Sequence, residues 1–235
     1  EKDQVEVVSG LRFGKTLGSP IALLIRNLDF ETWAEIMPSF DERTKKTEKV
    51  TLPRAGHADL AGVLKYDCDD VRDIMERASA RETAMRTALS VPARNFLDHL
   101  GVKAVSFVRR VGDISIKVPS ALSFERLTRK IQTHGEEFLT PDKSVIPAWK
   151  NSIDSARERG DTLGGEVEVQ FWGVLPGLGS HVHCDRRLDG RLGRALLALP
   201  AVKAVEIGEG ISMSAQNGTH VRDEINYEKK RGFFR

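Results

Sequence analysis

Apolar and polar residues alternate along several short stretches of the chain, which is the pattern of strands with one buried face. The clearest is 166–171 (EVEVQF), in which every second residue is apolar. Similar stretches at 5–10, 102–111 and 202–207 predict further strands. An unbroken apolar run at 21–26 (IALLIR) follows a Gly-Ser-Pro turn and predicts a buried strand.

Apolar residues three or four positions apart predict helices at 123–134, 146–159 and 188–199. Helices and strands follow one another without the regular rhythm of a parallel sheet, so we expect an α+β fold. The 235 residues contain no repeats or low-complexity tracts, and we predict one domain over 1–235. Within it, the charged segment 41–49 has no apolar period and predicts a mobile surface loop.

A further helix is predicted to begin at Asp69 or Asp70, either of which can cap it. Pro92 lacks the N–H that a helix interior needs, so we expect a break or a kink near Ser90. A second helical segment is then expected to end at Gly101, because glycine readily takes the conformation that closes a helix.

Two arginines of this helix, Arg77 and Arg81, stand four positions apart and would project from one face. There they could hold a phosphate or a carboxylate by bidentate hydrogen bonds. The small residues between them would let a flat ligand come close to the helix. The same arginines could instead form salt bridges with Glu76 and Glu82 on a solvated surface, and the residues alone leave both interpretations open.

A polar loop at 53–59 carries the best candidate for acid–base chemistry. Gly56 permits a tight turn, and His57 has a side chain that titrates near neutral pH. Arg54 could hold an anionic group while His57 donates a proton to it or its neighbour. The competing interpretation is a structural histidine, with Asp59 orienting the loop.

Composition excludes several classes of protein. The formal net charge of +2 is too small to indicate nucleic-acid binding, and no apolar run approaches the roughly 20 residues of a membrane span. The two cysteines are far apart in sequence and do not suggest a disulfide framework, so a reducing compartment is expected.

One short segment has residue types that bind metals. On a strand, His181, His183 and Asp185 would share a face and could hold zinc. This makes a zinc-dependent hydrolase an alternative function. No second cluster completes the site, however, and a polar loop is the simpler interpretation.

With these residues considered, the chain resembles the chorismate synthase family nearly from end to end. The histidine loop and the Arg-Ala-Ser-Ala-Arg-Glu-Thr segment are its most specific signatures. The matching segments, in the same order and spacing, are 9–10, 14–22, 56–59, 65–66, 77–83, 160–165, 177–180, 185–189, 205–208 and 222–225.

The resemblance implies a lyase of the shikimate pathway, which makes aromatic amino-acid precursors. Such an enzyme converts 5-enolpyruvylshikimate-3-phosphate to chorismate by 1,4-elimination of phosphate. It requires reduced FMN, which some members reduce with NADPH. It also implies a β-α-β sandwich fold, a homotetramer, and a location in the cytoplasm, or in the plastid of a plant.

The resemblance also assigns roles to single residues. His57 corresponds to one of two catalytic histidines, an acid towards the reduced flavin. Arg54 and Arg81 correspond to ligands of the substrate's anionic groups. The FMN-contacting positions are Arg77, Ala78, Ser79, Pro200 and Ala201. Pro200 departs from the family, which usually has Asn or Gln there, so that side-chain hydrogen bond is lost.

The family's N-terminal Gly-Glu-Ser-His-Gly segment, with its other catalytic histidine, has no counterpart in the chain. Neither do its C-terminal Lys-Pro motif and catalytic aspartate. We therefore expect an internal fragment, incomplete at both ends, that is weakly active or inactive by itself. A non-catalytic binding or assembly module is the remaining alternative.

Overall fold

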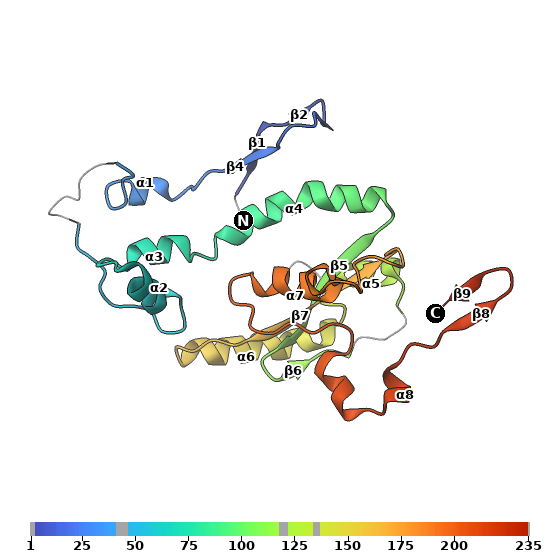
Figure 1. Cartoon of the computed structure of the whole chain (residues 1–235). Helices are drawn as coiled ribbons and strands as arrows, with labels where there is room; N and C mark the ends of the chain where they lie inside the picture. The colour runs from blue at the N-terminus through green and yellow to red at the C-terminus, as the bar shows by residue number, and fades with distance from the viewer. Residues whose placement is uncertain (1–2, 41–46, 118–121, 134–136, 235) are drawn as a thin grey trace. The chain divides into compact units, whose positions relative to one another are not determined.

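The computed structural model describes residues 3–40, 47–117, 122–133 and 137–234, and its helices and strands mix as an α+β fold requires (Figure 1). Two compact units are present. The first combines Glu1–Leu89 with Gly179–Arg235, and the second is Ser90–Leu178. The single domain predicted over 1–235 stays a prediction.

The second unit is built on an antiparallel sheet in the order β6-β5-β7. β5 (Lys103–Val111) pairs with β7 (Gly165–Trp172) along nearly its whole length, from Lys103 opposite Trp172 to Val111 opposite Gly165. The short β6 (Ile114–Ser115) returns beside the end of β5. Both longer strands were predicted, because alternation identifies a strand with one face on a core.

Two helices share a core with this sheet. On α5 (Phe124–Thr133), Leu127 and Ile131 stand one turn apart and are both buried. On α6 (Ile146–Glu158), which follows a 3-10 turn η1 (Lys143–Val145), Trp149 and Ala156 are buried. Amphipathic spacing in the sequence therefore predicted both helices correctly.

Trp149 lies at the centre of this core. It is buried with Phe107 of β5 and Leu127 of α5, and its ring centroid lies 5.6 Å from that of Phe138. The indole Nε1–H donates to the carbonyl oxygen of Ile114 at 2.9 Å, so the buried polar group is satisfied. The core therefore ties α6 to the strand hairpin β5-β6.

The first unit contains three small antiparallel pairs instead of one sheet. β1 (Val5–Ser9) pairs with β4 (Ala22–Ile25), and β2 pairs with β3. β8 pairs with β9 near the C-terminal end. The short strands are Leu11–Arg12 (β2), Lys15–Thr16 (β3), Asn226–Glu228 (β8) and Gly232–Phe234 (β9).

The helices of the first unit are mostly short. Three that matter for the candidate site are α2 (Asp59–Tyr66), α3 (Arg72–Arg77) and α4 (Glu82–His99), the last of which extends across the boundary of the two units. The others are α1 (Phe30–Trp33), η2 (Cys184–Arg186), α7 (Leu188–Leu197), η3 (Gly210–Ala215) and α8 (Gly218–Val221). No helix within the described ranges is long and apolar enough to cross a membrane.

The predicted helix beginning at Asp69 or Asp70 is interrupted, and of the break or kink predicted near Ser90 the break is wrong, while the kink stays a prediction. The chain leaves helix after Arg77 and resumes it at Glu82. The hydroxyl of Ser79 accepts a hydrogen bond from the backbone N–H of Arg81 at 3.2 Å, a local bond that competes with helix. α4 then continues through Pro92, because proline removes a single backbone bond from a long helix.

Two strand predictions also need correction. Residues 202–207 form no strand: the sheets of the described chain provide no neighbour to pair with them. β4 is a strand as predicted, but it is not buried. Its residues are alternately exposed and half-buried, because β1 is its only strand partner in the described part of the chain and covers neither face.

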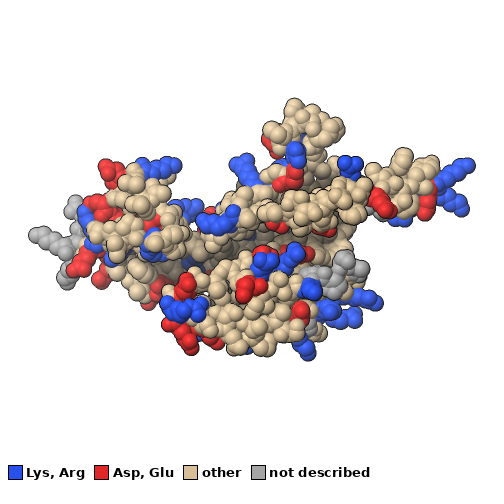
Figure 2. Space-filling view, turned by 90° about the horizontal axis from the view of Figure 1, so that it is seen from below, with Lys and Arg blue, Asp and Glu red and all other residues tan. Residues whose placement is uncertain are grey.

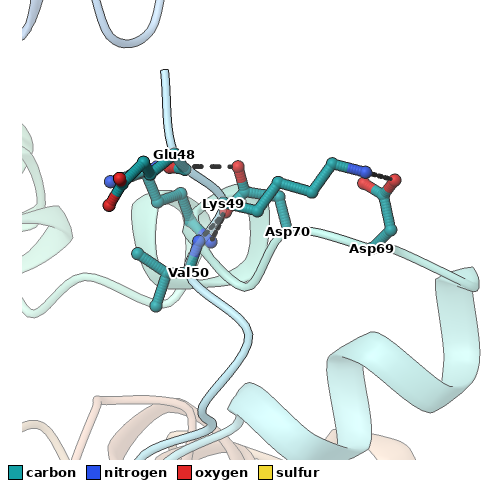
Figure 3. A network of polar contacts seen from close by, with 6 residues as sticks. Glu48, Lys49, Val50, Asp69 and Asp70 are labelled. Carbon is teal, nitrogen blue, oxygen red and sulfur yellow. Dashed lines mark hydrogen bonds and ion pairs between the residues drawn. The ribbon is translucent and has the colours of Figure 1, made fainter. Parts of the chain in front are cut away.

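A polar network holds the segment before the histidine loop to the start of α3 (Figure 3). Asp70 is buried and accepts hydrogen bonds from the backbone N–H groups of Val50 (3.2 Å) and Arg72 (3.1 Å). Lys49 forms an ion pair with Asp69. These contacts bring the chain back beside α3 just before it enters the loop.

Most of the predicted mobile loop at 41–49 cannot be compared with the structure. Residues 41–46 lie outside the described part of the chain, and only the last three belong to it. Of those three, Glu48 accepts a hydrogen bond at its carbonyl oxygen from the guanidinium of Arg72. Mobility of 41–49 stays a prediction.

Candidate active site

The histidine loop ends where α2 begins. Gly56 has φ +76°, a left-handed conformation that favours glycine, and it turns the chain back towards the helix. His57 follows on the outside of this turn and is exposed. Asp59 is the first residue of α2 and is completely buried. The turn therefore presents an imidazole to solvent while the carboxylate two residues later points inward.

Asp59 binds Arg54 through three hydrogen bonds. The backbone N–H and Nε–H of Arg54 donate to Oδ2 of Asp59 at 2.9 and 2.8 Å, and Nη2 donates to Oδ1 at 3.1 Å. The side-chain bonds from Arg54, then its backbone bond, lower the pKa of Asp59 from 3.8 to about 2, with a smaller contribution from His57. These bonds agree with the interpretation that Asp59 orients the loop.

A pocket of about 280 Å³ lies between α2 and α3, close to this loop in sequence and in space. Most of its wall is apolar, and Lys65 and Arg77 bring two positive charges to it. The two helices approach closely here: a Cβ added to Gly62 would lie only 2.5 Å from the side chain of Ile74. The lining residues are Ala58, Ala61, Gly62, Lys65, Tyr66, Ile74, Arg77 and Ala78.

The pocket suits one part of a flavin mononucleotide. Small residues on α2 allow a flat, apolar ring system to approach the backbone. The ammonium of Lys65 and the guanidinium of Arg77 suit an anionic group. Two of the five predicted FMN-contacting residues, Arg77 and Ala78, line this pocket, whereas Ser79, Pro200 and Ala201 do not.

The two arginines predicted to clamp one anion do not share a helix face. Arg77 closes α3, and its side chain is 85% exposed with Nη2 3.8 Å from Glu82. Arg81 lies in the break between helices, where Nη2 donates to Asp3 at 2.9 Å and to the carbonyl oxygen of Arg26 at 3.3 Å. A joint clamp from one face is therefore wrong for this structure, because the helix is broken between them.

Pro200 and Ala201 follow α7 within the same unit as the loop. Ala201 has φ +68°, an unusual left-handed conformation for a residue with a Cβ. Pro200 has no backbone N–H, so this turn can offer a ligand only the Ala201 N–H and the two carbonyl oxygens.

The arrangement expected for zinc is not formed. His181 lies in a bend, His183 directly precedes the 3-10 turn η2 and Asp185 lies within it, so the three residues are not on one strand. Among the described residues, no group of three or more His, Cys, Asp or Glu side chains is placed to hold a metal ion. Within the part of the chain that it describes, the structure thus offers no support for the zinc-hydrolase alternative.

Residue-by-residue reasoning missed Lys65 and Tyr66 as parts of the pocket. A signal was available, since Ala58, Ala61 and Lys65 follow the spacing of one helix face. That stripe has small residues and one cation instead of large apolar side chains, which distinguishes a ligand-facing helix side from a core-facing one.

Charges of both signs are interspersed on the face shown in Figure 2. Ion pairs of the structure include Arg26 with Glu6 at 2.7 Å and Arg109 with Glu168 at 3.2 Å. A surface of this kind differs from the continuous basic stripe of a nucleic-acid-binding face.

Comparison with known proteins agrees with the resemblance seen in the motifs. The family model described as chorismate synthase matches residues 1–233. Curated chorismate synthases of Desulforamulus reducens and Aquifex aeolicus are 47% and 43% identical over the whole chain. The chain spans about 60% of the length of each of these relatives.

A solved structure titled "Crystal Structure of Chorismate Synthase" superposes with a TM-score of 0.78 at 38% identity. The match covers 99% of this chain and 64% of that one, which confirms the predicted fold. A family match of this extent, with the histidine loop and the segment 77–83 inside it, shows that the chain belongs to the chorismate synthase family.

Proposed function

We propose that the protein is a lyase that converts 5-enolpyruvylshikimate-3-phosphate to chorismate and phosphate by 1,4-elimination. The observation that carries the proposal is the family match over residues 1–233. The geometry supports it, because an exposed imidazole stands three residues from a fixed guanidinium in a turn followed by a cation-lined pocket. A proton donor and anion ligands are what the departure of a phosphate requires.

In this proposal Arg54 and Arg81 bind the anionic groups of the substrate, and His57 donates or holds a proton at its imidazole. Arg54 is held by Asp59 through its Nε side, which leaves Nη1–H groups for an anion. Arg81 contacts Asp3 and a carbonyl oxygen in this structure, so substrate binding would require a change of partner. A fixed cation stabilises the developing negative charge of the leaving phosphate.

Reduced FMN is the proposed cofactor, and it supplies electron density for the elimination without net redox change. Arg77 and Ala78 would hold it at the pocket, with Ser79, Pro200 and Ala201 as the other proposed contacts. Ala78 adds little bulk beside a flat ring, and Arg77 offers a positive charge. His57 would act beside this group as a proton donor.

We further propose NADPH as a reductant of the flavin, a homotetrameric assembly and a cytoplasmic location. Light scattering of the purified complete gene product measures its mass directly. A tetramer agrees with the proposal, and a monomer at micromolar concentration contradicts that part of it.

The decisive experiment measures anaerobic chorismate formation by the complete gene product with the enolpyruvyl phosphate substrate and chemically reduced FMN. We expect turnover, and we expect His57→Ala to lower kcat by about 10²- to 10⁴-fold, the usual contribution of a positioned acid. His99→Ala, a histidine at the end of α4, is the matched control and should retain activity.

Absence of turnover in a folded complete protein that binds FMN contradicts the lyase proposal and favours a non-catalytic module. The 235-residue chain is assayed in parallel. We expect little or no activity from it, because it spans about 60% of the length of its relatives.

A further inference from the structure

Asp59 is the one residue of the histidine loop that is completely buried, and all three of its described hydrogen bonds come from Arg54. We infer that Asp59 is a positioning residue that fixes the guanidinium of Arg54 and so presents its outer edge to the anionic substrate. The inference rests on the proposed function, in which Arg54 is a substrate ligand.

The hydrogen bonds among the described residues determine which side of the Arg54 guanidinium Asp59 occupies and which side it leaves for a ligand. Arg54 has five side-chain N–H groups, and Asp59 takes those on Nε and on the near side of Nη2. The end of the fork, with both N–H groups of Nη1 and the second of Nη2, keeps the geometry that binds a phosphate or carboxylate bidentately. Because the carboxylate of Asp59 binds the Nε side of the guanidinium, the end formed by Nη1 and Nη2 can bind the anionic group of a substrate.

Asp59 is more deeply buried than Arg54, as expected if Asp59 positions Arg54 and Arg54 binds the substrate. The side chain of Asp59 is 0% exposed, whereas that of Arg54 is 42% exposed. The carboxylate lies inside the turn and the guanidinium extends from it towards solvent. In an ordinary surface ion pair, such as Arg26 with Glu6, both partners are exposed at 69% and 48%.

The backbone adds a third constraint. The N–H of Arg54 donates to Oδ2 of Asp59 at 2.9 Å, which closes the loop from residue 54 to residue 59 around His57. The same carboxylate thus sets the position of the Arg54 backbone and the direction of its side chain. Arg54 and His57 thereby belong to one turn that this hydrogen bond closes.

Geometry and charge make opposite predictions for the removal of this carboxylate. Asp59 cancels the positive charge of Arg54, so its loss makes the site more positive. If attraction of the substrate were its main effect, an amide at this position would lower the KM. If positioning is its role, the KM rises, because the fork is no longer held in its binding orientation.

The test uses the complete gene product with Asp59→Asn, Arg54→Lys and the double variant. Glu6→Gln is the matched control, since it makes the same change in an exposed bidentate pair. We expect Asp59→Asn to raise the KM for 5-enolpyruvylshikimate-3-phosphate about tenfold, the value of one charged hydrogen bond, with a much smaller fall in kcat. In the Arg54→Lys background the same substitution should change the KM little.

A KM that falls or stays unchanged in Asp59→Asn overturns the inference, as does an equal rise in the Arg54→Lys background. Thermal unfolding of each variant is measured in parallel. If Asp59→Asn does not fold, Asp59→Glu decides, because it keeps the charge of the carboxylate and moves it by one methylene, so that it no longer holds the fork of Arg54 in place. Asp59→Glu should raise the KM about tenfold in a folded protein, and an unchanged KM contradicts the inference. The unmodified enzyme is assayed first, so that absence of turnover is assigned to the proposed function alone.

Discussion

Two buried carboxylates, Asp59 and Asp70, organise the segments around the candidate site. Each accepts hydrogen bonds from backbone N–H groups, at Arg54 for the first and at Val50 and Arg72 for the second. A buried carboxylate is stable only when such donors and a cation satisfy it. At the residue scale, polar bonds hold the histidine loop and the start of α3 in place.

Asp59 should make the stability of the chain depend on acid pH. Its pKa is lowered from 3.8 to about 2, chiefly by the side chain of Arg54. A carboxylate with a depressed folded pKa stabilises the fold above its unfolded pKa, and this contribution is lost as pH falls. We expect the free energy of unfolding to decrease between about pH 4 and pH 2, and Asp59→Asn to remove part of that decrease.

Urea unfolding at several pH values between 5 and 2 measures this slope. Glu6→Gln is the comparison, because the pKa of Glu6 is also lowered, by its hydrogen bond to Arg26, but in an exposed pair. The two variants should differ in slope, with the larger loss of pH dependence in Asp59→Asn. Equal pH dependence of the free energy of unfolding in the two variants would contradict a larger contribution from the buried carboxylate of Asp59.

At the scale of elements, the close approach of α2 and α3 forms the floor of the pocket. Gly62 has no room for a Cβ, since Ile74 would lie 2.5 Å away. Gly193 on α7 is also helical, and a Cβ added there would meet nothing within 4 Å. Comparing alanine substitutions at Gly62 and Gly193 therefore separates the effect of packing on stability from the effect of helix propensity.

We predict opposite results for alanine at these two glycines. Gly193→Ala should stabilise the protein by about 0.5–1 kcal/mol, because alanine favours helix. Gly62→Ala gains the same propensity but forces Ile74 aside, which costs about 1–3 kcal/mol and should leave it the less stable variant. Chemical denaturation measures both, and a Gly62→Ala protein as stable as Gly193→Ala would contradict the packing at α2 and α3.

On the scale of the whole molecule, the main apolar core lies in the 90–178 unit, where Phe107, Leu127 and Trp149 are buried together. In the other unit, the buried apolar residues among those described are Val71 and Ala88. Its β1 strand is exposed at every residue. A two-stranded pair without a covered face is marginally stable by itself.

Hydrogen exchange of the 235-residue chain should show this difference. Amides of β5 and β7 are expected to exchange most slowly, because opening them requires loss of the Trp149 core. Amides of β1 and β4 should exchange fastest among the strands. Mass spectrometry of peptides covering each strand measures the rates. Equal protection of β1 and β5 would show that the β1-β4 pair is stabilised by contacts that this structure lacks.

The amino-acid sequence by itself determined the elements whose patterns have a local cause. Alternation predicted β5 and β7, and amphipathic spacing predicted α5, α6 and α7. The motifs also identified the family and placed His57 in a glycine turn. These features depend on neighbours within a few residues, which a sequence displays directly.

Only the tertiary structure decided the features that depend on partners distant along the chain. Residues 202–207 alternate like a strand and have no strand to pair with in the described chain, whereas α4 continues through Pro92. Arg77 and Arg81 are separated by a break that Ser79 stabilises, and Arg81 instead reaches Asp3. The pocket between α2 and α3 likewise requires Gly62 and Ile74 to meet. Pairing, burial and the contents of a site are properties of contacts in space, and periodicity along the chain does not specify them.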